Sequence, residues 1–158
     1  MKKIYVREDW CLGCHLCEYY CANANLGGGD MWKNLKGKAI RPRIRVEGDN
    51  NVSFAVQCRH CDEPHCLKGC IAGAISIIEG VVSIDQNKCV GCCTCVLTCP
   101  YGCIVPTETG VMSKCELCVN NAGQAKKDKE GGIVGFIPAC VQNCPNNAIV
   151  VEETEVTA

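Results

Sequence analysis

Large apolar side chains are scarce in this sequence. Only 5% of its 158 residues are aromatic, and only two are Phe. Because folding must offset the conformational entropy that the polypeptide loses, something besides an ordinary hydrophobic core must hold this protein together. The sequence does contain 18 cysteines, and a short chain so rich in cysteine is typically either a secreted disulfide scaffold or a metal protein.

Targeting signals and uninterrupted apolar runs are also missing. The first ten residues carry five charged side chains and lack the apolar core of a signal peptide, a twin-arginine signal and a cleavage site. Two long uncharged stretches, 89–107 and 131–151, are interrupted by Pro, Gly, Asn and regularly spaced cysteines, which argues against a membrane span. We therefore predict no secretion, no direct membrane span and a cytoplasmic location where thiols stay reduced.

The cysteines fall into four groups, and their spacing is the strongest signal in the chain. Groups one and three follow C-x2-C-x2-C-x3-C, the run of bacterial ferredoxins. Group two reads C-x2-C-x4-C-x3-C, and group four is opened by a 21-residue insertion before a final C-x3-C-P. The groups are Cys11, Cys14, Cys17 and Cys21; Cys58, Cys61, Cys66 and Cys70; Cys89, Cys92, Cys95 and Cys99; and Cys115, Cys118, Cys140 and Cys144.

The residues that follow each group form a second repeat. In three groups the third residue after the last cysteine is Gly or Asn, which tolerate positive φ, and the next two are a small residue and Ile. These triplets are Gly73-Ala74-Ile75, Gly102-Cys103-Ile104 and Asn147-Ala148-Ile149. The pattern predicts a tight turn that leads into a short strand. Group one departs from it, and its glycine-rich segment 27–30 reads as the start of an insertion.

Two β-hairpins are predicted between the groups. Segments 74–78 and 81–85 are β-branched runs joined by Glu79-Gly80. Segments 40–47 and 52–57 flank a Gly-Asp-Asn turn, and Arg41, Arg43 and Arg45 form one face of the first segment. This basic face either docks a partner or offsets the charge of bound metal clusters, and the second interpretation is favoured. Segments 107–113 and 120–132 are interpreted as loops.

The spacing favours iron-sulfur clusters as cofactors. Three cysteines at C-x2-C-x2-C can surround one corner of a [4Fe-4S] cubane, and Gly13 and Gly91 let backbone amides approach the sulfurs. In two-cluster ferredoxins the trailing cysteine ligates the other cluster, so four motifs make two exchanged pairs. Structural zinc is the main alternative, although zinc knuckles come as separated C-x2-C pairs. A disulfide framework would require secretion.

Bound clusters would also decide the charge of the protein. The formal net charge of −1 counts every thiol as neutral, whereas metal ligation requires thiolates. A [4Fe-4S] core with four thiolates carries roughly two negative charges. The loaded protein is therefore expected to be acidic and to have no nucleic-acid partner.

Five other residues beside the ligands can take part in metal or redox chemistry. Cys93 and Cys103 are extra to the four motifs, and we predict that neither is a ligand. Cys103 falls on an alanine position of the repeat and is interpreted as a small buried residue, whereas Cys93 has an alternative role as a redox-sensitive thiol. His15, His60 and His65 are interpreted as exposed or structural, with hydrogen bonding to sulfur as the alternative.

The four groups in this order resemble the iron-sulfur subunits of the dimethyl sulfoxide reductase family and their relatives serving carbon monoxide dehydrogenases, hydrogenases and tungsten aldehyde oxidoreductases. The resemblance covers nearly the whole chain and rests on segments 11–18, 58–66, 88–95 and 138–145. With no signal, anchor or long extension, the chain is similar to the short cytoplasmic branch of that family.

The resemblance implies an α+β fold, in which tandem bacterial-ferredoxin-like modules with short β-hairpins and short helices surround four [4Fe-4S] clusters. Motifs one and four share an outer module (1–26 plus 107–158), motifs two and three share an inner module (58–106), and 27–57 is an inserted β-hairpin. The implied ligands are Cys11, Cys14, Cys17 and Cys144 (first outer set); Cys21, Cys115, Cys118 and Cys140 (second outer set); Cys58, Cys61, Cys66 and Cys99 (first inner set); and Cys70, Cys89, Cys92 and Cys95 (second inner set).

The implied role is that of a non-catalytic subunit that relays single electrons. Its partners would be a large catalytic metalloenzyme subunit (a tungsten or molybdenum oxidoreductase such as a formate dehydrogenase, a carbon monoxide dehydrogenase or a hydrogenase) and a second redox partner such as ferredoxin or a flavoprotein. The sequence shows no nucleotide loop, flavin site or activated nucleophile, so the cofactors carry the chemistry. A freely diffusing polyferredoxin, a filament-forming electron conduit and a zinc scaffold remain as alternatives.

Overall fold

The computed structural model describes residues 2–49, 51–119, 125–127 and 133–153, in which short helices alternate with short strands. This mixture confirms the predicted α+β class. The helices are η1 (Glu8–Trp10), α1 (Leu16–Asn25), α2 (Met31–Leu35), α3 (His65–Lys68), α4 (Thr94–Thr98) and α5 (Ala139–Gln142). The strands are β1 (Lys2–Val6), β2 (Ile44–Gly48), β3 (Ser53–Gln57), β4 (Ile75–Ile78), β5 (Val81–Ile84), β6 (Ile104–Pro106), β7 (Met112–Lys114), β8 (Ala125–Lys127), β9 (Ile133–Phe136) and β10 (Ile149–Glu153).

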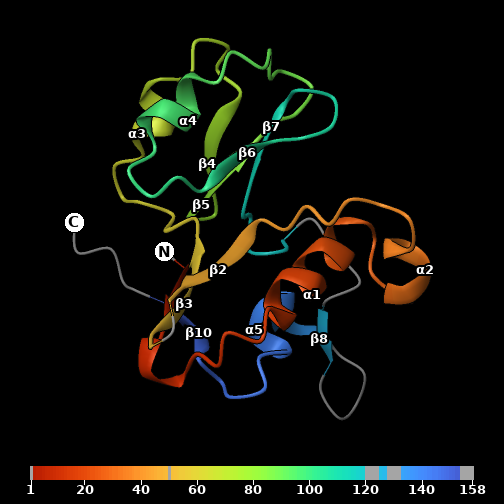
Figure 1. Cartoon of the computed structure of the whole chain (residues 1–158). Coiled ribbons are helices and arrows are strands. Elements are labelled where there is room, and N and C mark those ends of the chain that lie inside the picture. Colours follow the sequence, from red (N-terminus) through yellow and green to blue (C-terminus); the bar gives the residue numbers. More distant parts are fainter. Residues whose placement is uncertain (1, 50, 120–124, 128–132, 154–158) are drawn as a thin grey trace.

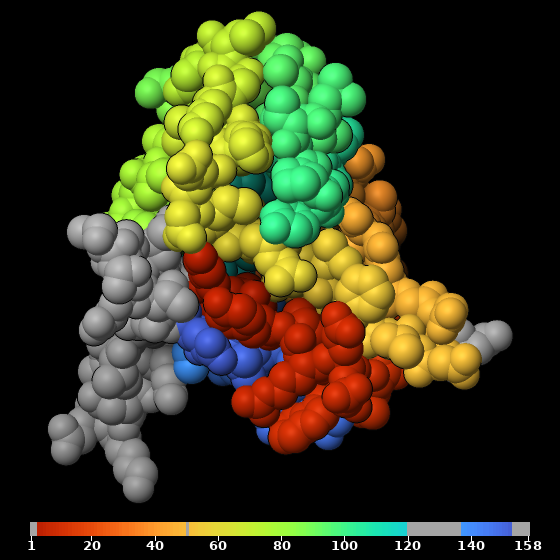
Figure 2. Space-filling model, turned by 90° about the vertical axis from the view of Figure 1, so that its left-hand side faces the viewer, coloured from red at the N-terminus to blue at the C-terminus, as the bar shows by residue number. Residues whose placement is uncertain are grey.

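Segments from the two ends of the chain lie together in one lobe. Strands β1 and β10 pair antiparallel, with Ile4 opposite Val151, and helix α1 packs against α5. Figure 2 shows the red N-terminal segment directly against the blue C-terminal one. The structure therefore brings together the surroundings of motifs one and four, which are separated in the sequence by the 93 residues 22–114.

The second lobe is continuous in sequence. Hairpins β4–β5 and β6–β7 lie beside helices α3 and α4, which pack against each other in the upper part of Figure 1. The β2–β3 hairpin packs on the first lobe, where β2 contacts α1 and β3 contacts β1. It also reaches the second lobe, because Arg45 of β2 donates to the carbonyl oxygen of Gly102 at 2.7 Å. Among the described residues, no helix combines the length and apolar character needed to cross a membrane.

The turn predicted after the last cysteine is confirmed in all three groups. Gly73 and Gly102 both have φ 57° and Asn147 has φ 50°, and each donates its N–H to the carbonyl of the last cysteine at 3.2 Å. Strands β4, β6 and β10 begin two residues later. The hairpin at Glu79-Gly80 is also confirmed, because both residues have the positive φ that a type I′ turn requires.

Three predicted segments need correction. Strand β2 begins only at Ile44, so residues 40–43 precede the hairpin, and 27–57 also contains helix α2. Residues 107–113 are not all loop, because Met112 and Ser113 belong to β7 and pair with β6. The predicted loop 120–132 contains strand β8, and the rest of it lies outside the described residues. These short strands carry no distinctive pattern of their own and depend on their partner strands.

Cysteines form part of both hydrophobic cores. The core of the first lobe combines Ile4 and Ile149 with buried cysteines, and the core of the second surrounds Val82, Ile84 and a further cysteine. The buried cysteines in these cores are Cys17, Cys21, Cys115 and Cys140 in the first and Cys95 in the second. The protein thus fills with thiols the space that aromatic side chains occupy in other small domains.

Candidate iron-sulfur sites

Two of the four implied ligand sets each line one cavity. Cys11, Cys14, Cys17 and Cys144 of the first outer set line one cavity, whose other walls include Trp10 and Ile149. The cavity joins the loop before α1 to the residues that follow α5. Cysteines 130 residues apart in sequence therefore meet in space.

The second inner set lines another cavity. Its sulfurs come from Cys70, Cys89, Cys92 and Cys95, and its apolar walls come from neighbouring residues such as Ile75 and Met112. Burial raises the pKa of Cys95, and charges on Cys89, Cys70 and Cys92 would raise it further. All four thiols therefore face the same cavity.

The thiols of the second outer set lie close enough together for the charge of one to raise the pKa of another. Burial raises the pKa of Cys140 far above its usual value, and the nearest charges that add to this are those of Cys115, Cys21 and Cys118. Burial likewise raises the pKa of Cys21 to about 11, with Cys118 contributing. The structure places these four buried or half-buried thiols close together.

The thiols of the first inner set also raise each other's pKa values. Burial raises the pKa of Cys66 to about 11, and charges on Cys58 and Cys99 add to the effect. Burial also raises the pKa of Cys61, and again Cys58 and Cys99 contribute. Cys99 therefore lies with the second motif, whereas the first three cysteines of its own motif line the other inner cavity.

The donor sets fit iron-sulfur clusters. Neighbouring thiols that disfavour each other's thiolate forms need a cationic centre before they can ionise together. Backbone amides also point at the sulfurs: the N–H groups of Arg43, Ala74, Met112 and Ala148 donate to Cys21, Cys70, Cys89 and Cys144 at 3.2–3.3 Å. Such N–H···S bonds stabilise thiolates and tune cluster potentials.

Group one replaces one of these backbone donors by a side chain. In groups two and four the donor is the amide four residues after the last cysteine. Helix α1 instead continues through Cys21 to Asn25, whose side-chain amide donates to the Cys21 Sγ at 3.5 Å. Group one lacks the triplet that predicts a turn after the last cysteine, and this departure in the sequence corresponds to the continued helix.

Left-handed backbone at the residue before the second cysteine is shared by all four motifs. Gly13 and Gly91 adopt it, as their sequence predicts, with φ of 63° and 71°. His60 and Leu117 adopt it as well, with φ of 45° and 53°, although their side chains disfavour it. Sequence reasoning missed these two residues, and their place in the aligned motifs was the only signal.

The three histidines differ in their surroundings. His15 and His65 are exposed, and His15 contacts Glu18 through Nδ1 at 3.0 Å. His60 is fully buried, and its Nδ1 accepts a hydrogen bond from the Val82 N–H at 3.1 Å. Burial lowers the pKa of His60 to about 3, with the charge of Lys114 adding to the effect. The predicted exposed or structural roles are consistent with these surroundings.

The two extra cysteines line neither of the two cavities. Cys103 is buried, as predicted for its alanine position, and burial raises its pKa to about 12. Cys93 is exposed, and its Sγ lies 3.4 Å from the carbonyl oxygen of Gly91. That neither residue is a ligand stays a prediction.

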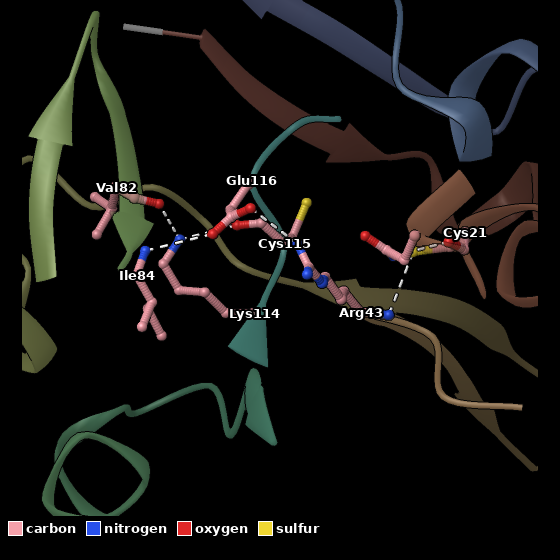
Figure 3. A network of polar contacts seen from close by, with 8 residues as sticks. Cys21, Arg43, Val82, Ile84, Lys114, Cys115 and Glu116 are labelled. Atoms are coloured by element: carbon pink, nitrogen blue, oxygen red, sulfur yellow. Dashed lines mark hydrogen bonds and ion pairs between the residues drawn. The ribbon is translucent and has the colours of Figure 1, made fainter. Parts of the chain in front are cut away.

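Each arginine of the basic face contacts a carboxylate of the same protein. Arg43 donates to Glu116 at 2.9 Å, and the two side chains are only 19% and 11% exposed (Figure 3). Arg41 lies 3.5 Å from the exposed Glu108, and Arg45 pairs with Glu47. The buried Arg43 pair links the β2–β3 hairpin to the segment that carries Cys115 and Cys118.

We expect Arg43→Gln to destabilise the protein by about 2–3 kcal/mol, a value between those of buried and exposed ion pairs, because it leaves Glu116 without its guanidinium. The matched control is Arg41→Gln, whose pair is 52% and 71% exposed and should cost less than about 0.5 kcal/mol. Chemical denaturation of the cluster-loaded protein measures both. Equal effects of the two substitutions would contradict the assigned role of the buried pair.

The lobes, the cysteine-lined cavities and the N–H···S bonds define an iron-sulfur protein of the ferredoxin type. The family described as the 4Fe-4S dicluster domain matches residues 50–154. The chain belongs to this family, which supports [4Fe-4S] clusters rather than structural zinc as its cofactors.

Curated relatives extend the match beyond that domain. The sequence is 36% identical to an iron-sulfur protein of Rhodospirillum rubrum, with 92% of this chain and 79% of the relative covered. It is 32% identical to the electron transport protein HydN of Escherichia coli (89% and 81% covered) and 30% identical to the B subunit of the anaerobic dimethyl sulfoxide reductase of the same species (92% and 70%). The predicted resemblance to the dimethyl sulfoxide reductase iron-sulfur subunits is confirmed.

Solved structures show the same fold. The protein matches one polypeptide of the BamBC active-site complex of benzoyl-coenzyme A reductase over 100% of its own length and 79% of the other, with a TM-score of 0.52 and 21% identity. At this identity the likeness supports the fold alone.

Proposed function

We propose that this protein is a non-catalytic subunit that relays single electrons through four [4Fe-4S] clusters. The observation that supports the proposal is that two cavities are each lined by four cysteines drawn from two motifs, while charges link the thiols proposed for the two other sets. Bound clusters would supply one-electron chemistry. The polypeptide would position them, exclude water and donate N–H groups to their sulfurs.

The proposed ligands are the four sets named above, in an outer module (1–26 plus 107–158) and an inner module (58–106) joined by the 27–57 insertion. Strand β7 (Met112–Lys114) of the outer segment pairs with β6 of the inner module. Their neighbours suggest a linear order. The charge of Cys17 acts on Cys140, which connects the two outer sets, and that of Cys58 acts on Cys115, which connects the outer and inner modules. Within the inner module, α3 and α4 pack together and carry cysteines of both sets.

The two ends of this line would exchange electrons with partners. Cys14 of the first outer set and Cys92 of the second inner set are exposed, and each is the second cysteine of its motif. An exposed apolar side chain lies near each of these cysteines in the sequence, Leu12 near Cys14 and Val90 near Cys92. We propose a cytoplasmic complex in which one end meets a large catalytic oxidoreductase subunit of the tungsten, molybdenum, carbon monoxide dehydrogenase or hydrogenase type, and the other meets ferredoxin or a flavoprotein.

Anaerobic purification from the native source tests the proposal, with iron and sulfide quantified per chain and the co-purifying proteins identified. About sixteen irons per chain together with an associated large oxidoreductase are expected. Sixteen irons without an associated enzyme would favour a diffusible polyferredoxin. Light scattering that rises with concentration would favour a filament. A clearly lower iron content would overturn the count of four clusters.

A further inference from the structure

Lys114 is a fully buried lysine at the boundary between the two lobes. It ends strand β7, directly before the ligand Cys115, and has no exposed surface. Its Nζ donates to the carbonyl oxygen of Val82 on β5 and to that of Cys115 at 2.8 Å (Figure 3). Lysines are almost never fully buried unless their charge is compensated.

The surroundings of Lys114 contain thiols from two different ligand sets. Lys114 directly precedes Cys115, of the second outer set, and donates to its carbonyl oxygen. On the other side, Val82, whose carbonyl also accepts from Lys114, donates its own N–H at 3.1 Å to His60, which lies between Cys58 and Cys61 of the first inner set. Nearby, Glu116 accepts hydrogen bonds from Arg43 and from the backbone N–H of Ile84.

A buried cation between two cluster sites affects their reduction. Each cluster core takes up one electron on reduction, from the 2+ to the 1+ state, so the cluster with its four thiolates gains one negative charge. A fixed positive charge nearby stabilises the reduced form more than the oxidised form. In a water-excluded site this interaction is much stronger than at the surface.

We propose that Lys114 is a shared tuning residue that raises the reduction potentials of the two clusters on either side of the boundary between the modules. This inference rests on the proposed function. Electrons that cross from one module to the other would pass these two clusters. The clusters of the first outer and second inner sets would be insensitive to it, because Lys114 lines neither of their cavities.

The test replaces Lys114 by Met, which removes the charge while keeping an unbranched side chain. EPR-monitored titration with dithionite under anaerobic conditions measures the potentials of the cluster-loaded protein. Two of the four clusters should become harder to reduce by at least tenfold in the equilibrium constant, which is about 59 mV each for a one-electron couple. The other two should stay at their wild-type values, and Lys114→Arg should keep all four.

Lys88→Met is the matched control. Lys88 also stands directly before the first cysteine of its motif, but its side chain is 66% exposed and lies 3.6 Å from Asp85. Water and dissolved ions screen this charge, so its removal should leave every potential unchanged.

Unchanged potentials in a four-cluster Lys114→Met protein would overturn the inference, as would an equal shift of all four clusters. If the Met variant does not retain its clusters, Lys114→Gln, which keeps a donor for the Val82 carbonyl, takes its place under the same criteria. Cluster loss in the Met, Gln and Arg variants alike would assign Lys114 a structural role only. A wild-type protein with fewer than four clusters would instead refute the proposed function before any variant is compared.

Discussion

Cys144→Ala is expected to reduce the number of [4Fe-4S] clusters per chain from four to three by removing the one held by Cys11, Cys14 and Cys17. The reason is that Cys144 lines the cavity of the first motif and not a site of its own motif. Spin integration of the EPR signal after full reduction counts the clusters. Cys103→Ala is the control, because it deletes a buried thiol outside the proposed ligand sets and should leave four clusters.

Double variants identify which cluster is lost. Cys14→Ala combined with Cys144→Ala should still leave three clusters, because both residues are assigned to one site. Cys118→Ala combined with Cys144→Ala should leave two, because these residues are assigned to different sites although they belong to one motif. The reverse result, two clusters in the first double variant and three in the second, would show that trailing cysteines serve their own motifs.

Removal of all clusters should abolish the cooperative unfolding transition. Without clusters, the walls of the two cysteine-lined cavities would lose both their packing contacts and the metal cross-links that join distant motifs. A typical domain has a net stability of only about 5–15 kcal/mol, so little remains to offset this loss. Isolated two-stranded sheets and helices of four or five residues cannot compensate, because each is marginal on its own.

Differential scanning calorimetry before and after anaerobic treatment with an iron chelator and mild oxidant measures this effect, with a thiol reductant added afterwards to keep the cysteines reduced. Reconstitution with iron and sulfide is the control, and it should restore the transition. A cluster-free protein that unfolds cooperatively at the original temperature would show that the polypeptide alone stabilises the fold.

Local features of the fold could be predicted because their causes are local. The turns at Gly73, Gly102 and Asn147 follow from residue types that tolerate positive φ, and the β4–β5 hairpin follows from β-branched runs around Glu79-Gly80. Strand β7 was missed, since three residues contain no periodicity and only pairing with β6 makes Met112–Lys114 a strand. Likewise, nothing in the sequence showed that Ile40–Arg43 would lie before β2 rather than within it.

The features of the candidate sites likewise include some that the sequence predicted and others that depend on packing. Cysteine spacing predicted the cofactor and the motifs, because iron-sulfur ligation imposes a spacing on neighbouring ligands. The burial of Lys114 could not be predicted, since Lys88 stands at the same place in its motif and is exposed. His60 and Leu117 hold the left-handed position that Gly13 and Gly91 occupy elsewhere, and only their packing shows how that strain is maintained.

By itself, therefore, the sequence determined the chemistry of this protein: four cysteine motifs, [4Fe-4S] ligation and short strands after tight turns. Those properties depend on residues a few positions apart. Which motifs meet did not follow from their spacing and was implied only by the family resemblance; the tertiary structure brings Cys144 to Cys11, and it alone places Lys114 at the boundary between the lobes. Loop closure costs little more for a long separation than for a short one, so spacing along the chain cannot select among such distant pairings, whereas packing of α1 against α5 and pairing of β1 with β10 can.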